Sequence, residues 1–134
     1  MSTGRLIGAI VVIFILSVVF GSTIHAFLLH DDYAALPGVF RPSAQVQLWP
    51  IMAAYLAFAV ASVWLYAHGV EDRPWFGQGV RFGIAVWLVL SVPSFLIEFA
   101  TQPVPETLVW KQLAYEFVNK VVLGIVTAAI VRRA

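Results

Sequence analysis

The chain has 134 residues, of which 61% are hydrophobic and only 11% are charged, with a formal net charge of +1 and no cysteine. A soluble domain carries about a quarter charged residues, so this composition excludes an ordinary soluble enzyme and indicates a membrane protein. The small net charge gives no reason to expect nucleic acid as a partner, and the lack of cysteine excludes disulfides and thiolate metal sites.

Four apolar runs predict an all-α bundle of four transmembrane helices in a single domain, residues 1–134. The expected spans are residues 6–29, 50–67, 80–100 and 107–131. These runs approach or exceed the roughly 20 residues that a helix needs to cross a hydrocarbon core. The first run is longer than the ~7–15 residues of a signal-peptide core and follows Met1 closely, so we expect it to be retained.

The distribution of Lys and Arg predicts the orientation of the bundle. Five arginines flank one side, and one arginine and one lysine flank the other: Arg5, Arg73, Arg81, Arg132 and Arg133 against Arg41 and Lys111. Because cytoplasmic flanks carry the excess of positive charge, the helices should be antiparallel with both termini in the cytoplasm. We expect the lipid bilayer to be a bacterial-type inner membrane.

Two connecting segments are expected to be irregular. Pro37 and Pro42 argue against a continuous helix after the first span, although a short interfacial turn is expected at Tyr33–Leu36. The segment with Gly77 and Gly79 is expected to be a flexible turn before the third span. No strand precedes these glycines and no Gly-Lys-Ser/Thr follows, so they do not form a phosphate loop.

Small residues at four-residue spacing predict where the helices pack. Lipid gives no hydrophobic drive for helix association, so small residues that let backbones approach mark helix contacts. Three such faces are present: Ala53, Ala57 and Ala61 on the second span; Ser17, Gly21 and His25 on the first; Gly124 and Ala128 on the fourth.

The fourth span carries a polar stripe. Its members share one helical face: Gln112, Glu116, Asn119, Lys120 and Thr127. Charge at bilayer depth is costly, so the stripe should face the bundle interior, a water-filled cavity or another protein. Three interpretations remain open: Glu116 and Lys120 form a structural ion pair at i,i+4, they bind or couple a solute, or the stripe docks a partner.

The remaining polar groups extend this pattern. Glu98 follows Pro93, which interrupts the third span and removes one backbone donor, and it is either a transport carboxylate or an interfacial one. If the orientation is right, further polar groups lie in the outer half of the membrane: His25, Tyr55, Glu98, Tyr115 and Glu116. They predict an outward-opening polar pocket with Asn119 beside it and Lys120 at its floor.

No cofactor or metal site is expected. His25 and His30 point about 140° apart on a helix and His68 lies on the opposite side of the membrane, so a haem pair is disfavoured. A cation at His30, Asp31 and Asp32 would lack further ligands.

Two classes of function remain. The sequence has no catalytic motif, and four short helices bury little surface, which favours a non-catalytic subunit that assembles with itself or with another membrane protein. The alternative is a small oligomeric transporter or channel that uses Glu98, Glu116 and Lys120. A cofactor-binding membrane protein or membrane enzyme using His25 is less favoured.

Overall fold

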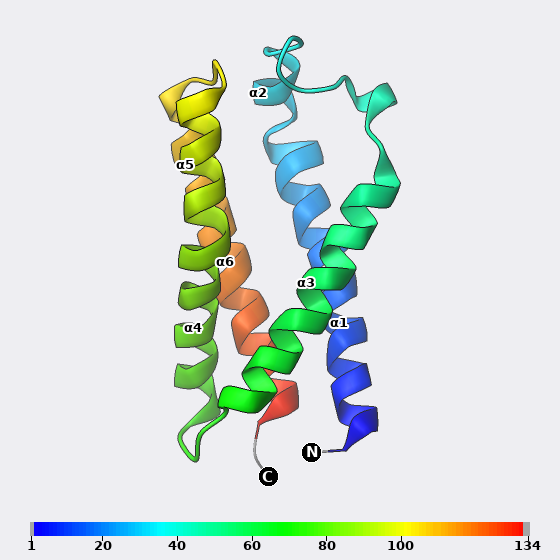
Figure 1. The fold of residues 1–134 in the computed structure, drawn as a ribbon, viewed down its shortest axis with the longest axis vertical. Coiled ribbons are helices and arrows are strands. Elements are labelled where there is room, and N and C mark those ends of the chain that lie inside the picture. The colour runs from blue at the N-terminus through cyan, green and yellow to red at the C-terminus, as the bar shows by residue number, and fades with distance from the viewer. Residues whose placement is uncertain (1, 133–134) are drawn as a thin grey trace.

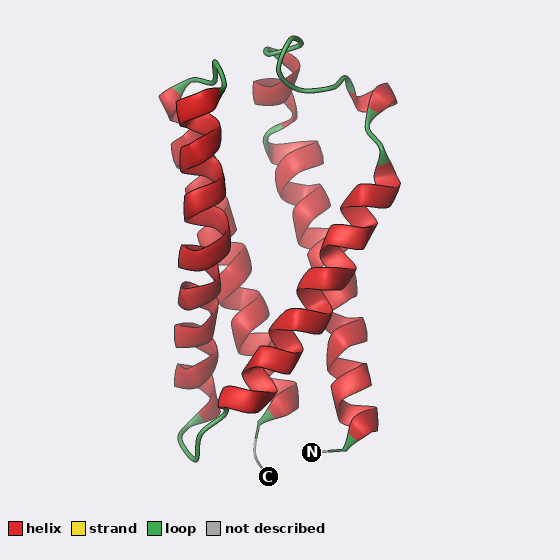
Figure 2. Cartoon of the chain, in the orientation of Figure 1, coloured by secondary structure: helices red, strands yellow, loops and turns green. Residues whose placement is uncertain are grey.

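The structure is a computed structural model that describes residues 2–132, so Met1, Arg133 and Ala134 lie outside the described residues. The described chain is all-helical, as predicted, and contains loops but no strand (Figure 2). Four helical segments are long and apolar enough to cross a membrane: Thr3–Leu28, Leu48–Gly69, Trp75–Thr101 and Glu106–Val131. The chain therefore has the helices of a multi-pass membrane protein.

The first and third segments each contain a π-helical stretch. The first consists of α1 (Thr3–Gly21) and the π-helix η1 (Ser22–Leu28). The second is α3 (Leu48–Gly69). The third consists of α4 (Trp75–Val86), the π-helix η3 (Trp87–Ser91) and α5 (Val92–Thr101). The fourth is α6 (Glu106–Val131).

Both chain termini lie at one end of the molecule in Figure 1, here called the terminal end. The opposite end, here called the loop end, carries the connection between the first two long segments (Figure 1). This connection contains the short helix α2 (His30–Ala34) and a 3₁₀ turn, η2 (Ser43–Gln45). The interfacial turn expected near Tyr33 is thus present, although it begins three residues earlier.

The third segment begins earlier than the sequence suggested. Helix α4 starts at Trp75, directly after Pro74, rather than at residue 80. Proline suits this position because its missing N–H costs nothing before the first helical turn. Gly77 and Gly79 therefore belong to a helix, and the prediction of a flexible turn there is wrong.

Helix α4 packs along α6 through glycines on both helices. A Cβ atom on Gly83 would lie 2.6 Å from the Val121 Cα, and one on Gly79 would lie 2.8 Å from the Ile125 Cα. On α6, a Cβ atom added to Gly124 would lie 2.8 Å from the Gly83 Cα. Only glycine permits such an approach, so this seam sets the distance between the two helices.

The packing face of α3 differs from the predicted one. Ala53, Ala57 and Ala61 are exposed, whereas Ala59 and Val63 are buried in a core shared with α1. Spacing alone cannot tell a small face that meets a neighbour from one that meets lipid.

Pro93 does not end the third segment. The π-helix η3 precedes it, and Pro93 takes the second position of α5. The Ser94 hydroxyl donates to the Leu90 carbonyl oxygen at 2.6 Å, which adds a side-chain bond to the helix next to the missing Pro93 N–H.

Candidate functional site

Glu116 is the centre of a buried polar cluster. Its carboxylate is 5% exposed and accepts three hydrogen bonds from two helices. Oε1 accepts from His25 Nε2 at 2.9 Å. Oε2 accepts from Lys120 Nζ at 2.7 Å and from Asn119 Nδ2 at 3.1 Å. A buried charge needs this kind of saturation to be tolerated at membrane depth.

His25 connects this carboxylate to the loop end. Its Nδ1 lies 2.7 Å from the Tyr33 hydroxyl, which also accepts from Gln112 Nε2 at 3.3 Å. Glu116 is an acceptor only, so His25 Nε2 carries a proton. In the neutral tautomer Nδ1 then accepts from Tyr33, and in the charged form it donates to Tyr33. The ring is thus bonded in either protonation state.

Tyr33 is held in its neutral form. Burial raises the pKa of its phenol to about 12, the Gln112 hydrogen bond opposes this shift, and the carboxylates of Glu98, Glu116 and Asp32 add to it. The hydroxyl therefore keeps its proton throughout the physiological range. A second contact fixes the short helix that carries Tyr33, because Lys111 Nζ on α6 lies 3.1 Å from Asp32 Oδ1.

Lys120 closes the other end of the cluster. Its side chain is 11% exposed, and its ammonium lies 5.1 Å from the centre of the Phe58 ring on α3. The ammonium thus has one carboxylate and one aromatic face as partners, both suited to a desolvated cation. The i,i+4 pair with Glu116 expected from the sequence is formed.

Three buried oxygens near the cluster have no partner within residues 2–132: Glu98 Oε1, Gln112 Oε1 and Asn119 Oδ1. Glu98 lies beside Gln112 and within electrostatic range of His25. Buried polar atoms normally have a hydrogen-bonding partner, so the cluster retains acceptors that a proton, a water molecule or a donor on a ligand can fill.

The cluster borders a cavity of about 610 Å³ at the loop end. Its wall combines polar and apolar groups: His25, Ala26, Tyr33, Phe40, Arg41, Ser43, Ala44, Val46 and Leu48. The cavity lies between η1 and the segment that leads into α3. His25 is the member of the charge cluster that lines it, so a solute in the cavity would meet the cluster at this ring.

The predicted site residues fall into two groups. His25, Glu116, Asn119 and Lys120 are bonded to one another, and Glu98 lies close to them. Two predicted tyrosines are placed differently. The Tyr55 hydroxyl rests against Gly21 and stays within electrostatic range of Glu116. Tyr115 has no hydrogen bond to the cluster within residues 2–132 and lines a mainly apolar cleft between the first segment and α6, whose wall also includes Asn119.

Tyr33 was missed as a site residue, and Gln112 was recognised only as part of the stripe. The signal for Tyr33 was weak, because an aromatic residue in an interfacial turn ordinarily anchors at the headgroups. In the part of the chain that the structure describes, no three His, Asp or Glu residues are grouped to hold a metal ion.

Comparison with protein-family models, with curated proteins and with solved structures found no match to this chain. The site must therefore be interpreted from its own geometry.

Proposed function

We propose that this protein is a small membrane transport protein in which the Glu116 cluster exchanges a proton with a solute in the loop-end cavity. The observation that carries the proposal is a continuous hydrogen-bonded chain. It begins at Tyr33 beside the cavity, passes through His25 and Glu116, and ends at Lys120. Each link joins groups that can hand on or hold a proton.

The charge balance of the cluster supports proton exchange. With His25 neutral, Glu98, Glu116 and Lys120 sum to one negative charge. A single proton, placed on His25 or Glu98, removes it. A further charged group, Arg41, lies on the cavity wall that His25 also lines. A solute that enters near Arg41 would alter this balance, which is the basis of coupling.

The contacts of the polar stripe weigh against a docking face. Glu116, Asn119 and Lys120 find partners inside the chain, so the cluster does not need another protein to satisfy its charges. A second candidate, a structural or homo-oligomeric subunit, is favoured by the exposed face of Ala53, Ala57 and Ala61 on α3. This face would let a second copy approach closely, and self-association is compatible with transport.

We further propose that the four helices are antiparallel in a bacterial-type inner membrane, with the terminal end in the cytoplasm. Within the described range, four arginines flank the helices at the terminal end: Arg5, Arg73, Arg81 and Arg132. Arg41 and Lys111 are the counterparts at the loop end. This asymmetry supports the orientation through the positive-inside rule.

The test is proton movement in liposomes that contain a pH-sensitive dye, under an imposed potassium diffusion potential and with a panel of organic cations and anions. His25→Asn should abolish solute-dependent acidification, because it removes the titratable link. His68→Asn is the matched control, since His68 is exposed and lies far from the cluster along α3. If liposomes with the wild type and with H25N acidify equally under every condition, the hydrogen-bonded chain from Tyr33 to Lys120 does not carry protons.

A further inference from the structure

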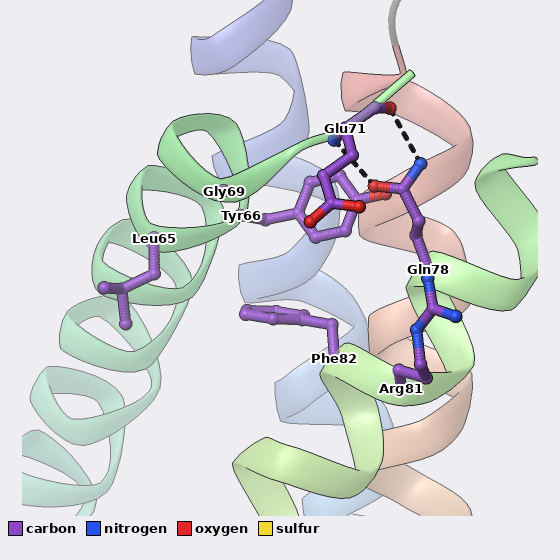
Figure 3. Close-up of a pocket in the computed structure, with 7 residues that line it drawn as sticks. All are labelled: Leu65, Tyr66, Gly69, Glu71, Gln78, Arg81 and Phe82. Atoms are coloured by element: carbon purple, nitrogen blue, oxygen red, sulfur yellow. Dashed lines mark hydrogen bonds between the residues drawn. The ribbon is translucent and has the colours of Figure 1, made fainter. Parts of the chain in front are cut away.

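A second pocket lies at the terminal end, where α3 ends and α4 begins. Its volume is about 160 Å³, and Figure 3 shows the seven residues that line it: Leu65, Tyr66, Gly69, Glu71, Gln78, Arg81 and Phe82. It is separate from the Glu116 cluster. Because Gly69 is the last residue of α3 and Trp75 the first of α4, the pocket sits at the depth where a membrane has its headgroups.

The frame of this pocket is rigid. Gln78 Oε1 accepts from the Glu71 backbone N–H at 2.8 Å, and Gln78 Nε2 donates to the carbonyl oxygens of Glu71 at 2.9 Å and Arg73 at 2.8 Å (Figure 3 draws the two bonds to Glu71). One buried amide thus fixes the whole loop between α3 and α4. The Tyr66 and Phe82 rings pack edge to face with their centroids 5.2 Å apart, and both rings line the pocket.

Tyr66 leaves a polar atom unsatisfied in this frame. The residue is 4% exposed, and its hydroxyl has no hydrogen-bonding partner in residues 2–132. Buried hydroxyl groups are normally paired, so this one indicates a group that the protein itself does not supply. Arg81 lies close enough to Tyr66 to interact with it electrostatically.

Two charged residues line the pocket, Glu71 and Arg81. Arg73 Nε lies 2.9 Å from Glu71 Oε2, so the carboxylate on the rim already has its counter-ion. Arg81 has no ion-pair partner within the described range. Where a guanidinium and an unpaired hydroxyl line the same pocket, a phosphate can accept two parallel bonds from arginine and a third from tyrosine.

We propose that this pocket binds the phosphate of an anionic membrane lipid. The phosphate accepts from Arg81 and from the Tyr66 hydroxyl, and the acyl chains lie along the apolar surface that continues at Leu65, which is 54% exposed. Basic pockets between helices near the cytoplasmic surface recognise lipid headgroups in this way. A bound lipid at this position would hold the α3–α4 hairpin to the bilayer surface.

The test is lipid titration of the delipidated, detergent-solubilised protein, followed by native mass spectrometry, with phosphatidylglycerol as the probe and phosphatidylcholine as the neutral comparison. Arg81→Gln should raise the apparent Kd for phosphatidylglycerol by at least about ten-fold, because it removes charge-assisted bonds. Arg5→Gln is the matched control: Arg5 is an exposed arginine at the same end but outside the pocket, so its Kd should change less than about two-fold.

Tyr66→Phe separates binding from folding. The hydroxyl has no partner in the described part of the protein, so the lipid-free variant should be at least as stable to heat as the wild type, while its affinity for phosphatidylglycerol falls. Equal losses in R81Q and R5Q, or unchanged affinity in Y66F, would overturn the proposal. Inorganic phosphate should not displace the lipid. Full displacement by it would overturn the assignment to a lipid in favour of a soluble phosphate.

Discussion

Replacement of Glu116 by glutamine should destabilise the protein far more than its small change in shape suggests. The new amide would keep an acceptor for His25 or Asn119, but Lys120 would lose its carboxylate while remaining only 11% exposed. Because both side chains are this well buried, solvent screening cannot compensate. Removing one partner of a buried ion pair costs about 3–5 kcal/mol of unfolding free energy, and we expect a loss of about 3 kcal/mol.

The complementary change, Lys120→Met, should cost less. Glu116 would still accept from His25 and Asn119, and methionine would retain an apolar stem of similar length while losing the ammonium that lies over Phe58. We expect a loss of about 2 kcal/mol. The double variant removes both charges and leaves neither unpaired, so its loss should be about 2 kcal/mol rather than the sum. The coupling energy is then about 3 kcal/mol.

The assay is reversible unfolding in mixed micelles of mild detergent and dodecyl sulfate, monitored by tryptophan fluorescence. A second cycle on Asp32→Asn and Lys111→Met is the matched control, because this pair has a similar geometry but is 24% and 49% exposed. Its coupling energy should stay below about 1 kcal/mol. If the Glu116–Lys120 coupling is equally small, the cluster is solvated and the reasoning from burial is refuted.

The same double variant separates a structural role from transport. If Glu116 and Lys120 only stabilise the bundle, a double variant that stays folded despite its smaller-than-additive loss should also retain proton movement in liposomes. If the cluster exchanges a proton, E116Q/K120M should be folded and inactive.

Further variants test other parts of the structure. Gly83→Ala should lower the unfolding free energy by about 1–3 kcal/mol through overpacking of the α4–α6 seam, while Gly77→Ala, which meets nothing within 4 Å, should be neutral or stabilising in the same unfolding assay. The absorbance difference between wild type and Tyr33→Phe should titrate at about pH 12 rather than near 10. The pKa of Tyr33 is higher in the folded than in the unfolded state, so the folded state binds more protons between these two values. The stability that Tyr33 contributes is therefore present below pH 10 and is lost between about pH 10 and 12. Gln78→Leu removes the three bonds that fix the loop, and hydrogen exchange at the Glu71 amide should accelerate by at least about ten-fold.

The features predictable from the sequence depend on local information. Long apolar runs indicated four spans, and helical periodicity placed Gln112, Glu116, Asn119 and Thr127 on one face, which the structure buries. Both inferences need only the helix period and the cost of polar groups in lipid.

Features that depend on contacts between distant residues could not be derived in this way. The bond between His25 and Glu116 joins positions 91 residues apart, and nothing within either helix specifies it. The predicted faces with Gly124 and Ala128 and with Ser17 and Gly21 are buried, but two other predictions were wrong for the same reason. Gly79 was expected in a turn but lies in the close-packed seam between α4 and α6, and Ala57 was expected in a seam but is exposed. Composition identifies surfaces that permit close approach, whereas rotation of the helix decides which surface is used.

The π-helix η1 explains how His25 reaches Glu116. In an α-helix each four-residue step drifts about 40° around the axis, so His25 would turn away from the buried face of Ser17 and Gly21. A π turn holds more residues than an α turn, so each residue rotates less around the axis and the drift is counteracted. Both Ser17 and Gly21 are buried, and His25, inside η1, still points inward to the carboxylate. The π-helix η1 thus aims one ring both at the cavity and at the buried Glu116 carboxylate.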